Sequence, residues 1–277
     1  MRYAGGKKKL IATILGRFGD DIISAILRGE VRTYTEPFVG GGGSAIRILR
    51  VLPSNLKIEL NDFDRNVADL WTCILREPDY LVKRIREHHL SVDSYKSAID
   101  ALEGEALDSR ERGFLTLFTQ QGSRNGSILK GPIGGWCQRN KNPRSQITSE
   151  WRPECLVSSV WQMHALLRKF RSCDISSTDF APLVRCAGPD TACYLDPPYF
   201  KAGPDLYRHG KFEHERLAGV LKKAKCHWLL SYDDHPAIRR LYSWAMIHDL
   251  EAGYERPDGS KALGRELVIV PREERRT

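Results

Sequence analysis

Short apolar runs alternate with stretches of helical spacing along the first part of the chain. Residues 33–39 and 57–60 are rich in β-branched, aromatic or apolar residues and are shorter than most helices, so we expect two buried strands. Apolar residues then recur at helical spacing in 45–51 and 65–75. This alternation predicts an α/β fold with a parallel sheet and helices on both faces.

The last third of the chain continues this pattern. We expect a strand at 193–195, a helix at 213–223, a strand at 227–231 and the start of a helix at 233–236. Two antiparallel strands at 244–250 and 266–270 complete the sheet.

Residues 64–170 differ from their surroundings. Further stretches of helical spacing follow one another there without a strand, at 70–88, 95–107, 114–121 and 157–170. We therefore expect a main domain made of 1–63 and 171–277, and a mostly helical insertion over 64–170.

The insertion contains a polar, basic loop before its last predicted helix. When proteins read the major groove, arginine pairs with guanine, and asparagine or glutamine with adenine. Candidates for contacts with DNA are Arg124, Asn125, Gln138, Arg139, Lys141 and Arg144. A solvated loop explains any single one of them equally well, whereas the region as a whole favours DNA contact.

Composition narrows the classes of function. The net charge of +8 favours a polyanionic partner. Seven cysteines without a CxxC pair or zinc-ligand spacing predict free thiols in a reducing compartment and no metal site. No apolar run approaches the length of a membrane span and no signal peptide is recognisable, so we expect a cytoplasmic protein without membrane contact.

The stretch Asp196-Pro197-Pro198-Tyr199 directly follows the strand expected at 193–195. Its prolines end the strand and stiffen the turn, at the sheet edge where open α/β folds bind ligands. Asp196 and the Pro197 carbonyl can accept hydrogen bonds from an exocyclic NH2 group, and Tyr199 can stack on a flat ring. Taken alone, the stretch is equally typical of a proline-rich strand exit.

A second group of motifs follows the first two predicted strands. Gly40-Gly41-Gly42-Gly43 lies between a strand and a helix, which is the arrangement of a nucleotide-type cofactor site. Asp62 follows the second strand, where such folds hold a ribose diol, and Asp64 is suited to cap the next helix. Because GxGxxG and P-loop motifs are absent, the implied cofactor has a ribose but no phosphate to grip, and S-adenosylmethionine fits that description.

Four stretches, in order, make the chain resemble the Dam-like DNA adenine-N6 methyltransferases: Tyr3-Ala4-Gly5-Gly6-Lys7, Glu36-Pro37-Phe38-Val39-Gly40-Gly41-Gly42, Asn61-Asp62-Phe63-Asp64 and Asp196-Pro197-Pro198-Tyr199. The resemblance implies a Rossmann-like S-adenosylmethionine-dependent methyltransferase sheet, with 1–63 and 171–277 as the catalytic domain and 64–170 as a target-recognition insertion. It also implies a site-specific enzyme that methylates N6 of adenine in double-stranded DNA.

The resemblance also implies residue roles. Cofactor contacts would come from the N-terminal arm, the glycine-rich loop, the end of the second strand, an Asp-Phe pair and the catalytic turn: Tyr3, Ala4, Gly5, Gly6, Lys7, Glu36, Pro37, Phe38, Gly40, Gly42, Asp62, Asp179, Phe180 and Asp196. The target adenine would be held by Asp196, Pro197, Pro198 and Tyr199. GATC-specific members carry an Asn-Gly-Leu-x-Arg signature where this chain has residues 116–125, which leaves the recognition sequence open.

Other functions are alternatives at this point. N4-cytosine methyltransferases more often have serine at the position of Asp196, and adenine methyltransferases of structured RNA usually have asparagine. A catalytically silent DNA-binding protein would not need Lys7, Asp62 and Asp196, and a dinucleotide oxidoreductase would need GxGxxG. We expect a monomer that binds double-stranded DNA.

Overall fold

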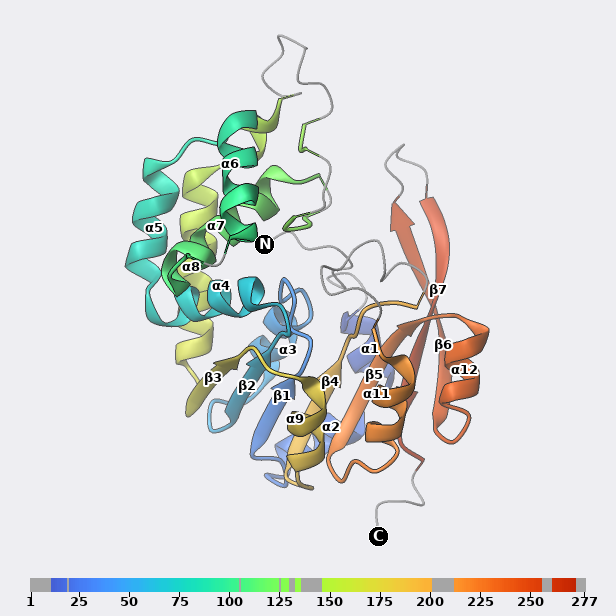
Figure 1. The fold of residues 1–277 in the computed structure, drawn as a ribbon. Helices are drawn as coiled ribbons and strands as arrows, with labels where there is room; N and C mark the ends of the chain where they lie inside the picture. Colours follow the sequence, from blue (N-terminus) through green and yellow to red (C-terminus); the bar gives the residue numbers. More distant parts are fainter. Residues whose placement is uncertain are drawn as a thin grey trace.

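A seven-stranded sheet forms the centre of the computed structural model, which describes residues 11–18, 20–104, 106–124, 126–129, 133–135, 146–200, 212–255 and 261–272. The strands lie in the order β3-β2-β1-β4-β5-β7-β6 (Figure 1). Their bounds are β1 (Thr33–Glu36), β2 (Lys57–Asn61), β3 (Ser172–Ser176), β4 (Thr191–Leu195), β5 (His227–Asp233), β6 (Met246–Glu255) and β7 (Lys261–Val270).

The sheet is doubly wound and ends in an antiparallel pair. Strands β1 to β5 run parallel to one another, and β7 is antiparallel to both β5 and β6. The strand order reverses between β1 and β4, because the chain continues from β1 to β2 and β3 on one side and from β4 to β5 on the other. Open α/β sheets bind ligands at such a switch point, so we expect the ligand site at the carboxyl ends of β1 and β4.

Helices cover both faces of the sheet, as the apolar runs predict. In Figure 1, α9 (Phe180–Cys186), α11 (His214–Leu221) and α12 (Pro236–Leu241) lie in front, and α1 (Ile11–Phe18), α2 (Asp20–Leu27) and α3 (Ala45–Val51) lie behind. Alternate strand residues divide accordingly: Ala192 and Tyr194 belong to the apolar core behind the sheet, whereas Cys193 and Leu195 belong to the core in front.

The chain between β2 and β3 is helical, as expected from the sequence. It forms α4 (Arg65–Arg76), α5 (Pro78–Glu87), α6 (Val92–Glu103), α7 (Ser109–Gly122), the short helix η2 (Ile147–Glu150) and α8 (Pro153–Arg168). One apolar cluster contains residues from these helices and from β1 and β2, for example Ile58 and Phe114. The separation of 64–170 as a DNA-binding domain stays a prediction.

One local expectation needs correction, two elements were missed and one expected cap is confirmed. The spacing over 70–88 suggests continuous helix, but the helix ends before Glu77, and Pro78, which has no N–H to donate, begins the next one. β3 and α9 were not expected from the sequence. Asp64 does cap α4, since its side chain accepts a hydrogen bond from the Asn66 N–H at 3.0 Å.

Candidate active site

The carboxyl ends of the parallel strands bring the predicted motifs to one edge of the sheet. Glu36 ends β1, Asp62 follows β2 and Asp196 follows β4, on the two sides of the switch point. These residues are 160 positions apart in sequence at most (196 − 36) and come together only through the strand order.

The glycine-rich loop after β1 is held by a tryptophan. Gly40 and Gly42 have φ angles of 48° and 67°, which L side chains rarely adopt. A Cβ atom on Gly42 would lie 2.1 Å from Cζ2 of Trp71, which is buried in α4. The indole Nε1 of Trp71 donates a hydrogen bond to the Gly40 carbonyl at 2.8 Å. Sequence reasoning missed this role of Trp71, because a tryptophan on an amphipathic helix is typical of any core.

Asp62 ties this loop to the end of β2. Its Oδ2 accepts a hydrogen bond from the Gly40 N–H at 2.8 Å, and its Oδ1 accepts one from the Asp64 N–H at 2.9 Å. Each carboxylate oxygen has two lone pairs, so the same group can also accept from a ligand hydroxyl. The half-buried position and fixed orientation of Asp62 therefore suit the ribose-binding role implied by the resemblance.

The neighbouring Asn61 joins three strand ends and was also missed. Its Nδ2 donates to the carbonyls of Pro37 and Thr178, each at 3.0 Å, and its Oδ1 accepts from the Thr178 N–H at 3.0 Å. The loops that follow β1, β2 and β3 are thus fixed to one another by a single buried side chain.

Glu36 is a buried acid with hydroxyl partners. Only 1 % of its surface is exposed, and it accepts hydrogen bonds from Tyr34 Oη at 2.6 Å and Ser44 Oγ at 3.4 Å. Burial raises the pKa of Glu36 to about 8; the hydrogen bond from Tyr34 opposes this rise, and the negative charge of Asp196 adds to it. Glu36 is therefore mainly protonated at neutral pH in the ligand-free protein.

Three carboxyl groups act electrostatically on the buried Tyr194. Burial and the nearby charge of Asp196, with smaller contributions from Glu36 and Glu266, raise the pKa of the Tyr194 phenol, against the effect of its hydrogen bond with Ser231. The charges of Asp196, Glu36 and Glu266 thus all act on one buried phenol next to the switch point.

The Asp196–Tyr199 turn is fixed by side chains from the C-terminal strands. Ser231 Oγ on β5 donates to Asp196 Oδ1 at 3.0 Å. Tyr199 Oη donates to Glu266 Oε2 on β7 at 2.7 Å, and the Phe200 N–H donates to Asp233 Oδ1 at 2.9 Å. These supporting residues were not assigned a role from the sequence.

Asp179 caps α9 and pairs with an arginine. Its carboxylate accepts from the Ala181 N–H at 2.8 Å and forms an ion pair with Arg216 at 2.7 Å. Burial disfavours its charge, but the hydrogen bonds from Arg216 and Ala181 outweigh burial and lower the pKa of Asp179 below its usual value. In this arrangement Asp179 already has strong donors, so a cofactor amino group would share the carboxylate with Arg216.

Three phenylalanines pack together beside Asp179. Phe180 begins α9, and its ring centroid lies 5.5 Å from that of Phe38 and 5.7 Å from that of Phe212. Phe38 and Phe212 are also 5.5 Å apart. The structure thus brings together the predicted cofactor residues Phe38 and Phe180 in one aromatic cluster, which can receive a flat ring.

Many predicted contact residues lie outside the described part of the chain. These are Tyr3, Ala4, Gly5, Gly6, Lys7, Asn125, Gln138, Arg139, Lys141 and Arg144. Arg124 is described: it is exposed at the end of α7, and its Nη2 donates to the Gly135 carbonyl at 3.1 Å. A bridge between Ser123 and Ile133 joins the two sides of this loop.

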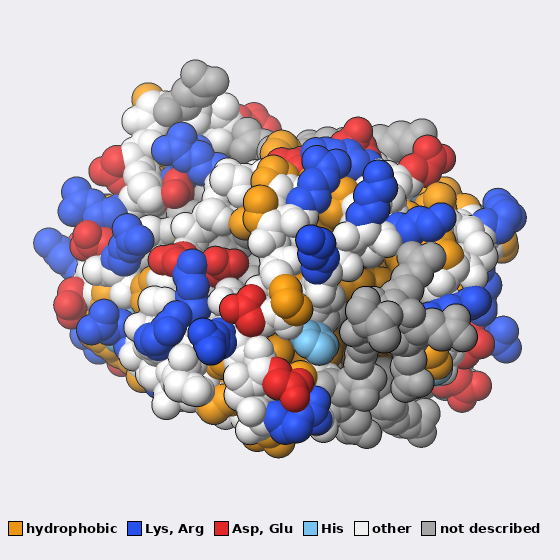
Figure 2. Space-filling view, turned by 90° about the horizontal axis from the view of Figure 1, so that it is seen from below, with side chains coloured by type: hydrophobic (Ala, Val, Ile, Leu, Met, Phe, Trp, Pro, Cys, Tyr) orange, Lys and Arg blue, Asp and Glu red, His pale blue; other side chains and the backbone are white. Residues whose placement is uncertain are grey.

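The opposite edge of the sheet has a mixed charge. Figure 2 shows this face from below, with basic and acidic side chains intermingled. Ion pairs at the amino ends of the strands contribute to the mixture, such as Arg28–Glu30 at 2.6 Å and Lys57–Glu59 at 2.7 Å.

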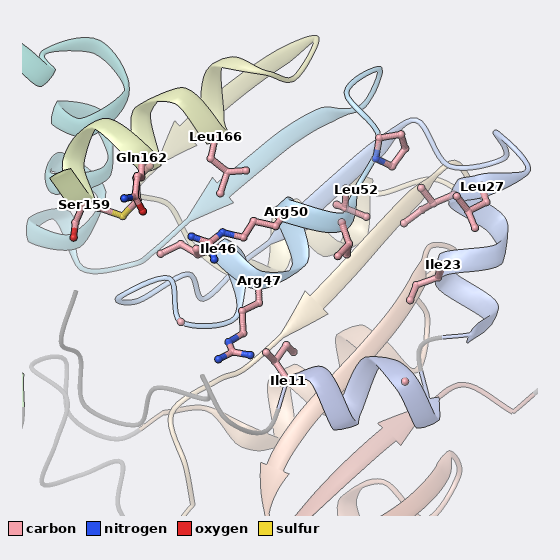
Figure 3. A pocket seen from close by; sticks show the side chains of 16 residues that line it. Ile11, Ile23, Leu27, Ile46, Arg47, Arg50, Leu52, Ser159, Gln162 and Leu166 are labelled. Atoms are coloured by element: carbon pink, nitrogen blue, oxygen red, sulfur yellow. The ribbon is translucent and has the colours of Figure 1, made fainter.

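A separate groove of about 860 Å³ lies between α1, α2, α3 and α8 (Figure 3). Ile46, Arg47 and Leu166 are among the residues that line it. None of the described candidate cofactor or catalytic residues does so. This groove is therefore not the site formed by the motifs.

No group of three or more side chains suited to a metal ion occurs among the described residues. In the same part of the chain, no helix is long and apolar enough to cross a membrane.

Part of the chain matches the model of a known protein family. Residues 3–122 match the family model described as D12 class N6 adenine-specific DNA methyltransferase, a match that ends before the Asp196–Tyr199 turn. No curated protein matches the chain in sequence.

Solved structures give weaker similarities. A SAM-dependent O-methyltransferase from Thermotoga maritima is 8 % identical, with a TM-score of 0.36 over 95 % of this chain and 71 % of that chain. The O-methyltransferase TomG from Streptomyces achromogenes is 12 % identical, with a TM-score of 0.36 over 90 % and 77 %.

The family match and the sheet topology agree on fold and chemistry. The expected Rossmann-like α/β methyltransferase fold is confirmed by the mixed seven-stranded sheet with helices on both faces. Together, the match over residues 3–122 and this sheet support an S-adenosylmethionine-dependent adenine-N6 DNA methyltransferase similar to the D12 class.

Proposed function

We propose that the edge between β1 and β4 is the methyl-transfer site and that Asp196 to Tyr199 hold the target adenine of double-stranded DNA. The observation that supports this most directly is that the strand order brings Glu36, Asp62 and Asp196 together at the carboxyl ends of β1, β2 and β4, on the two sides of the switch point. A family match identifies the reaction, but only this geometry suggests which groups act in it.

The residues at this edge fit S-adenosylmethionine. The described donor set is acidic, with Glu36, Asp62 and Asp196 as carboxyl groups and a glycine-rich loop that allows close backbone approach. Such a set suits a cationic ligand with a ribose and no phosphate. When bound, S-adenosylmethionine supplies a methyl group activated by its positive sulfur.

The proposed roles follow from this fit. Glu36, Pro37, Phe38, Gly40 and Gly42 lie on the β1 side of the cofactor. Asp62 holds the ribose hydroxyls, while Asp179 and Phe180 lie beside the cofactor's adenine. The arm residues Tyr3, Ala4, Gly5, Gly6 and Lys7 are included from the resemblance alone.

Asp196 and the Pro197 carbonyl prepare the nucleophile. The lone pair of the adenine amino nitrogen is delocalised into the ring, so the nitrogen attacks poorly by itself. Two acceptors for its N–H bonds favour a pyramidal nitrogen with an available lone pair and stabilise the positive charge that develops. Ser231, at 3.0 Å from Asp196 Oδ1, holds the carboxylate in place for this task. The nitrogen takes the methyl group, a neutral thioether is the leaving group, and the proton that the nitrogen loses passes to the Asp196 carboxylate or to water.

Tyr199 stacks on the target base, and the insertion binds the DNA. The target base must leave the duplex to reach Asp196, at a cost of a few kcal/mol. Stacking on Tyr199 offsets part of that cost, since base–aromatic stacking contributes about 1–3 kcal/mol. The net charge of +8 and the exposed Arg124 support DNA binding and sequence reading by the insertion. The proposal also includes a monomeric, cytoplasmic enzyme that needs no metal.

Single-molecule sequencing of unmethylated DNA treated with the protein and S-adenosylmethionine tests this function. We expect N6-methyladenine within one short sequence context. Marks scattered over many adenines would refute sequence reading by the insertion. N4-methylcytosine, or no mark while the cofactor binds, would refute the proposed reaction on double-stranded DNA.

A further inference from the structure

We propose that Glu266 is a positioning residue for methyl transfer, which holds the hydroxyl of Tyr199 and thereby fixes the ring on which the target adenine stacks. This inference rests on the proposed function of the Asp196–Tyr199 turn. It assigns a role in catalysis to β7, far from the catalytic turn in sequence.

The contact is short and buried. Tyr199 Oη donates to Glu266 Oε2 at 2.7 Å across 67 positions of the sequence. Glu266 is 1 % exposed, and a hydrogen bond away from water is electrostatically stronger than one in solvent.

The acceptor is attached to a stiff part of the sheet. β7 lies between β5 and β6 and pairs with both, so its backbone is held on two sides. Glu266 is opposite Asp233 in the register with β5, and Asp233 accepts the N–H of Phe200 at 2.9 Å. Two facing carboxyl groups on paired strands thus hold Tyr199, the last residue of the catalytic turn, and Phe200 directly after it.

The position of Glu266 in β7 is unfavourable for a structural role alone. Side chains alternate along a strand, so Glu266 points to the same face as Val268, which lies in the apolar core behind the sheet. A buried carboxyl group costs free energy that an apolar residue at this position would not. The hydrogen bond to Tyr199 explains why a carboxyl group is present at this buried position.

The ring itself has a second fixed neighbour. The centroid of Tyr199 lies 6.4 Å from that of Tyr232, at an interplanar angle of 31°. Tyr232 is fully buried on β5, and its hydroxyl is hydrogen-bonded to His214. With Tyr232 beside the ring and its hydroxyl held by Glu266, the orientation of the Tyr199 ring is restricted before a base arrives.

A double-mutant cycle tests the proposal. The assay compares kcat, and KM for DNA, of Glu266→Leu, Tyr199→Phe and the double variant. A second measurement uses DNA with 2-aminopurine at the mapped target position, because the fluorescence of 2-aminopurine reports whether the base is flipped. Each single variant should lower kcat roughly 10- to 100-fold without weakening cofactor binding. The combination should lower kcat no further, because both variants remove the same hydrogen bond. Glu266→Gln, which keeps an acceptor, should restore most of the rate.

Controls separate this inference from the proposed function. Glu251 is exposed on the adjoining β6, and Glu251→Gln should leave kcat unchanged. Losses of kcat that multiply in the double variant would overturn the proposal. If Glu266→Leu does not fold, an unchanged kcat for Tyr199→Phe would overturn it by itself. If Asp196→Ala remains active in the same assay, the proposed function itself fails; if only Asp196→Ala is inactive, the role of Glu266 alone is refuted.

Discussion

The two halves of the candidate active site are held in place by different means. On the cofactor side, the carboxylate of Asp62 is fixed by main-chain N–H groups of Gly40 and Asp64, which are 22 and 2 positions away. On the catalytic side, Asp196 and Tyr199 are fixed by side chains of Ser231 and Glu266, 35 and 67 positions away.

This difference indicates which parts of the site depend on the rest of the molecule. Main-chain donors survive most substitutions nearby, so the cofactor half depends on the backbone course of its loop and on Trp71 behind it. The catalytic half depends on individual polar side chains of β5 and β7, which single substitutions can remove. We therefore expect changes in the first half to act mainly on cofactor affinity and stability, and changes in the second on turnover.

The largest effect should come from Asp196. Asp196→Ala removes an acceptor of the amino N–H bonds, and kcat should fall by roughly 1,000-fold or more while cofactor affinity changes little. Methylation rates and equilibrium cofactor binding measure the two effects. Asp190, exposed at the other end of β4, provides the matched control, because Asp190→Ala should retain the full rate. Near-normal turnover of Asp196→Ala would remove it from the catalytic half.

A second large effect is expected in the loop of the cofactor half. Gly42→Ala places a methyl group 2.1 Å from Trp71 Cζ2 and forces a positive φ angle on alanine, so the free energy of unfolding should fall by about 2–5 kcal/mol. Gly29→Ala is the matched control, since Gly29 also has a positive φ, of 78°, but has open space around it. Denaturant unfolding of both variants separates the clash from the backbone strain. Equal losses would mean that Trp71 does not brace the loop.

The same comparison explains what could be predicted from the sequence. The elements of the cofactor half follow each other closely, so the strands, the glycine-rich loop, Asp62 and the cap Asp64 could all be expected from spacing and composition. The supports of the catalytic half could not, because Glu266 merely precedes an apolar run, and nothing in its neighbourhood indicates a partner 67 positions earlier.

Two elements were missed for a related reason. β3 is the edge strand of the sheet, none of its residues is fully buried, and Ser172, Asp174 and Ser176 alternate with its two apolar residues. A strand so polar lacks the apolar run on which the prediction of the other strands depends. α9 has seven residues and is stabilised by the Asp179 cap and by packing, which short-range patterns reveal poorly.

A smaller effect is expected at the end of β2. Asp62→Ala should weaken cofactor binding roughly 10- to 100-fold and leave DNA binding largely intact, because a charged group that accepts hydroxyl hydrogen bonds is lost. Asp64 lies two positions further and caps α4. Asp64→Ala should instead lower the free energy of unfolding by about 1 kcal/mol with little effect on cofactor affinity. Calorimetric titration of both variants with the cofactor compares them, and unchanged affinity of Asp62→Ala would exclude the ribose role.

The last expected effect is a pH dependence due to Glu36, an acid of the cofactor half whose pKa is raised by burial to about 8. In the unfolded chain this carboxyl group has a pKa near its ordinary value of 4.5. Between these two values the native protein holds one proton more than the unfolded chain, so stability decreases as pH rises from 4.5 to 8. At about 1.4 kcal/mol for each pKa unit, the decrease due to this group over the whole range should be at most about 5 kcal/mol.

Glu36→Gln separates this contribution from all other titrations. Glutamine stays neutral and can still accept hydrogen bonds from Tyr34 and Ser44. The free energy of unfolding of the variant should therefore depend less steeply on pH over this range. Cofactor affinity tests the other half of the argument. A cation bound beside Glu36 favours its ionised form, so affinity in the unmodified protein should rise between pH 6 and 8, with release of a proton, and Glu36→Gln should abolish that rise. If both proteins show the same pH dependence of affinity, the charge of Glu36 plays no part in cofactor binding, and the cofactor half depends on its main-chain geometry and Asp62 alone.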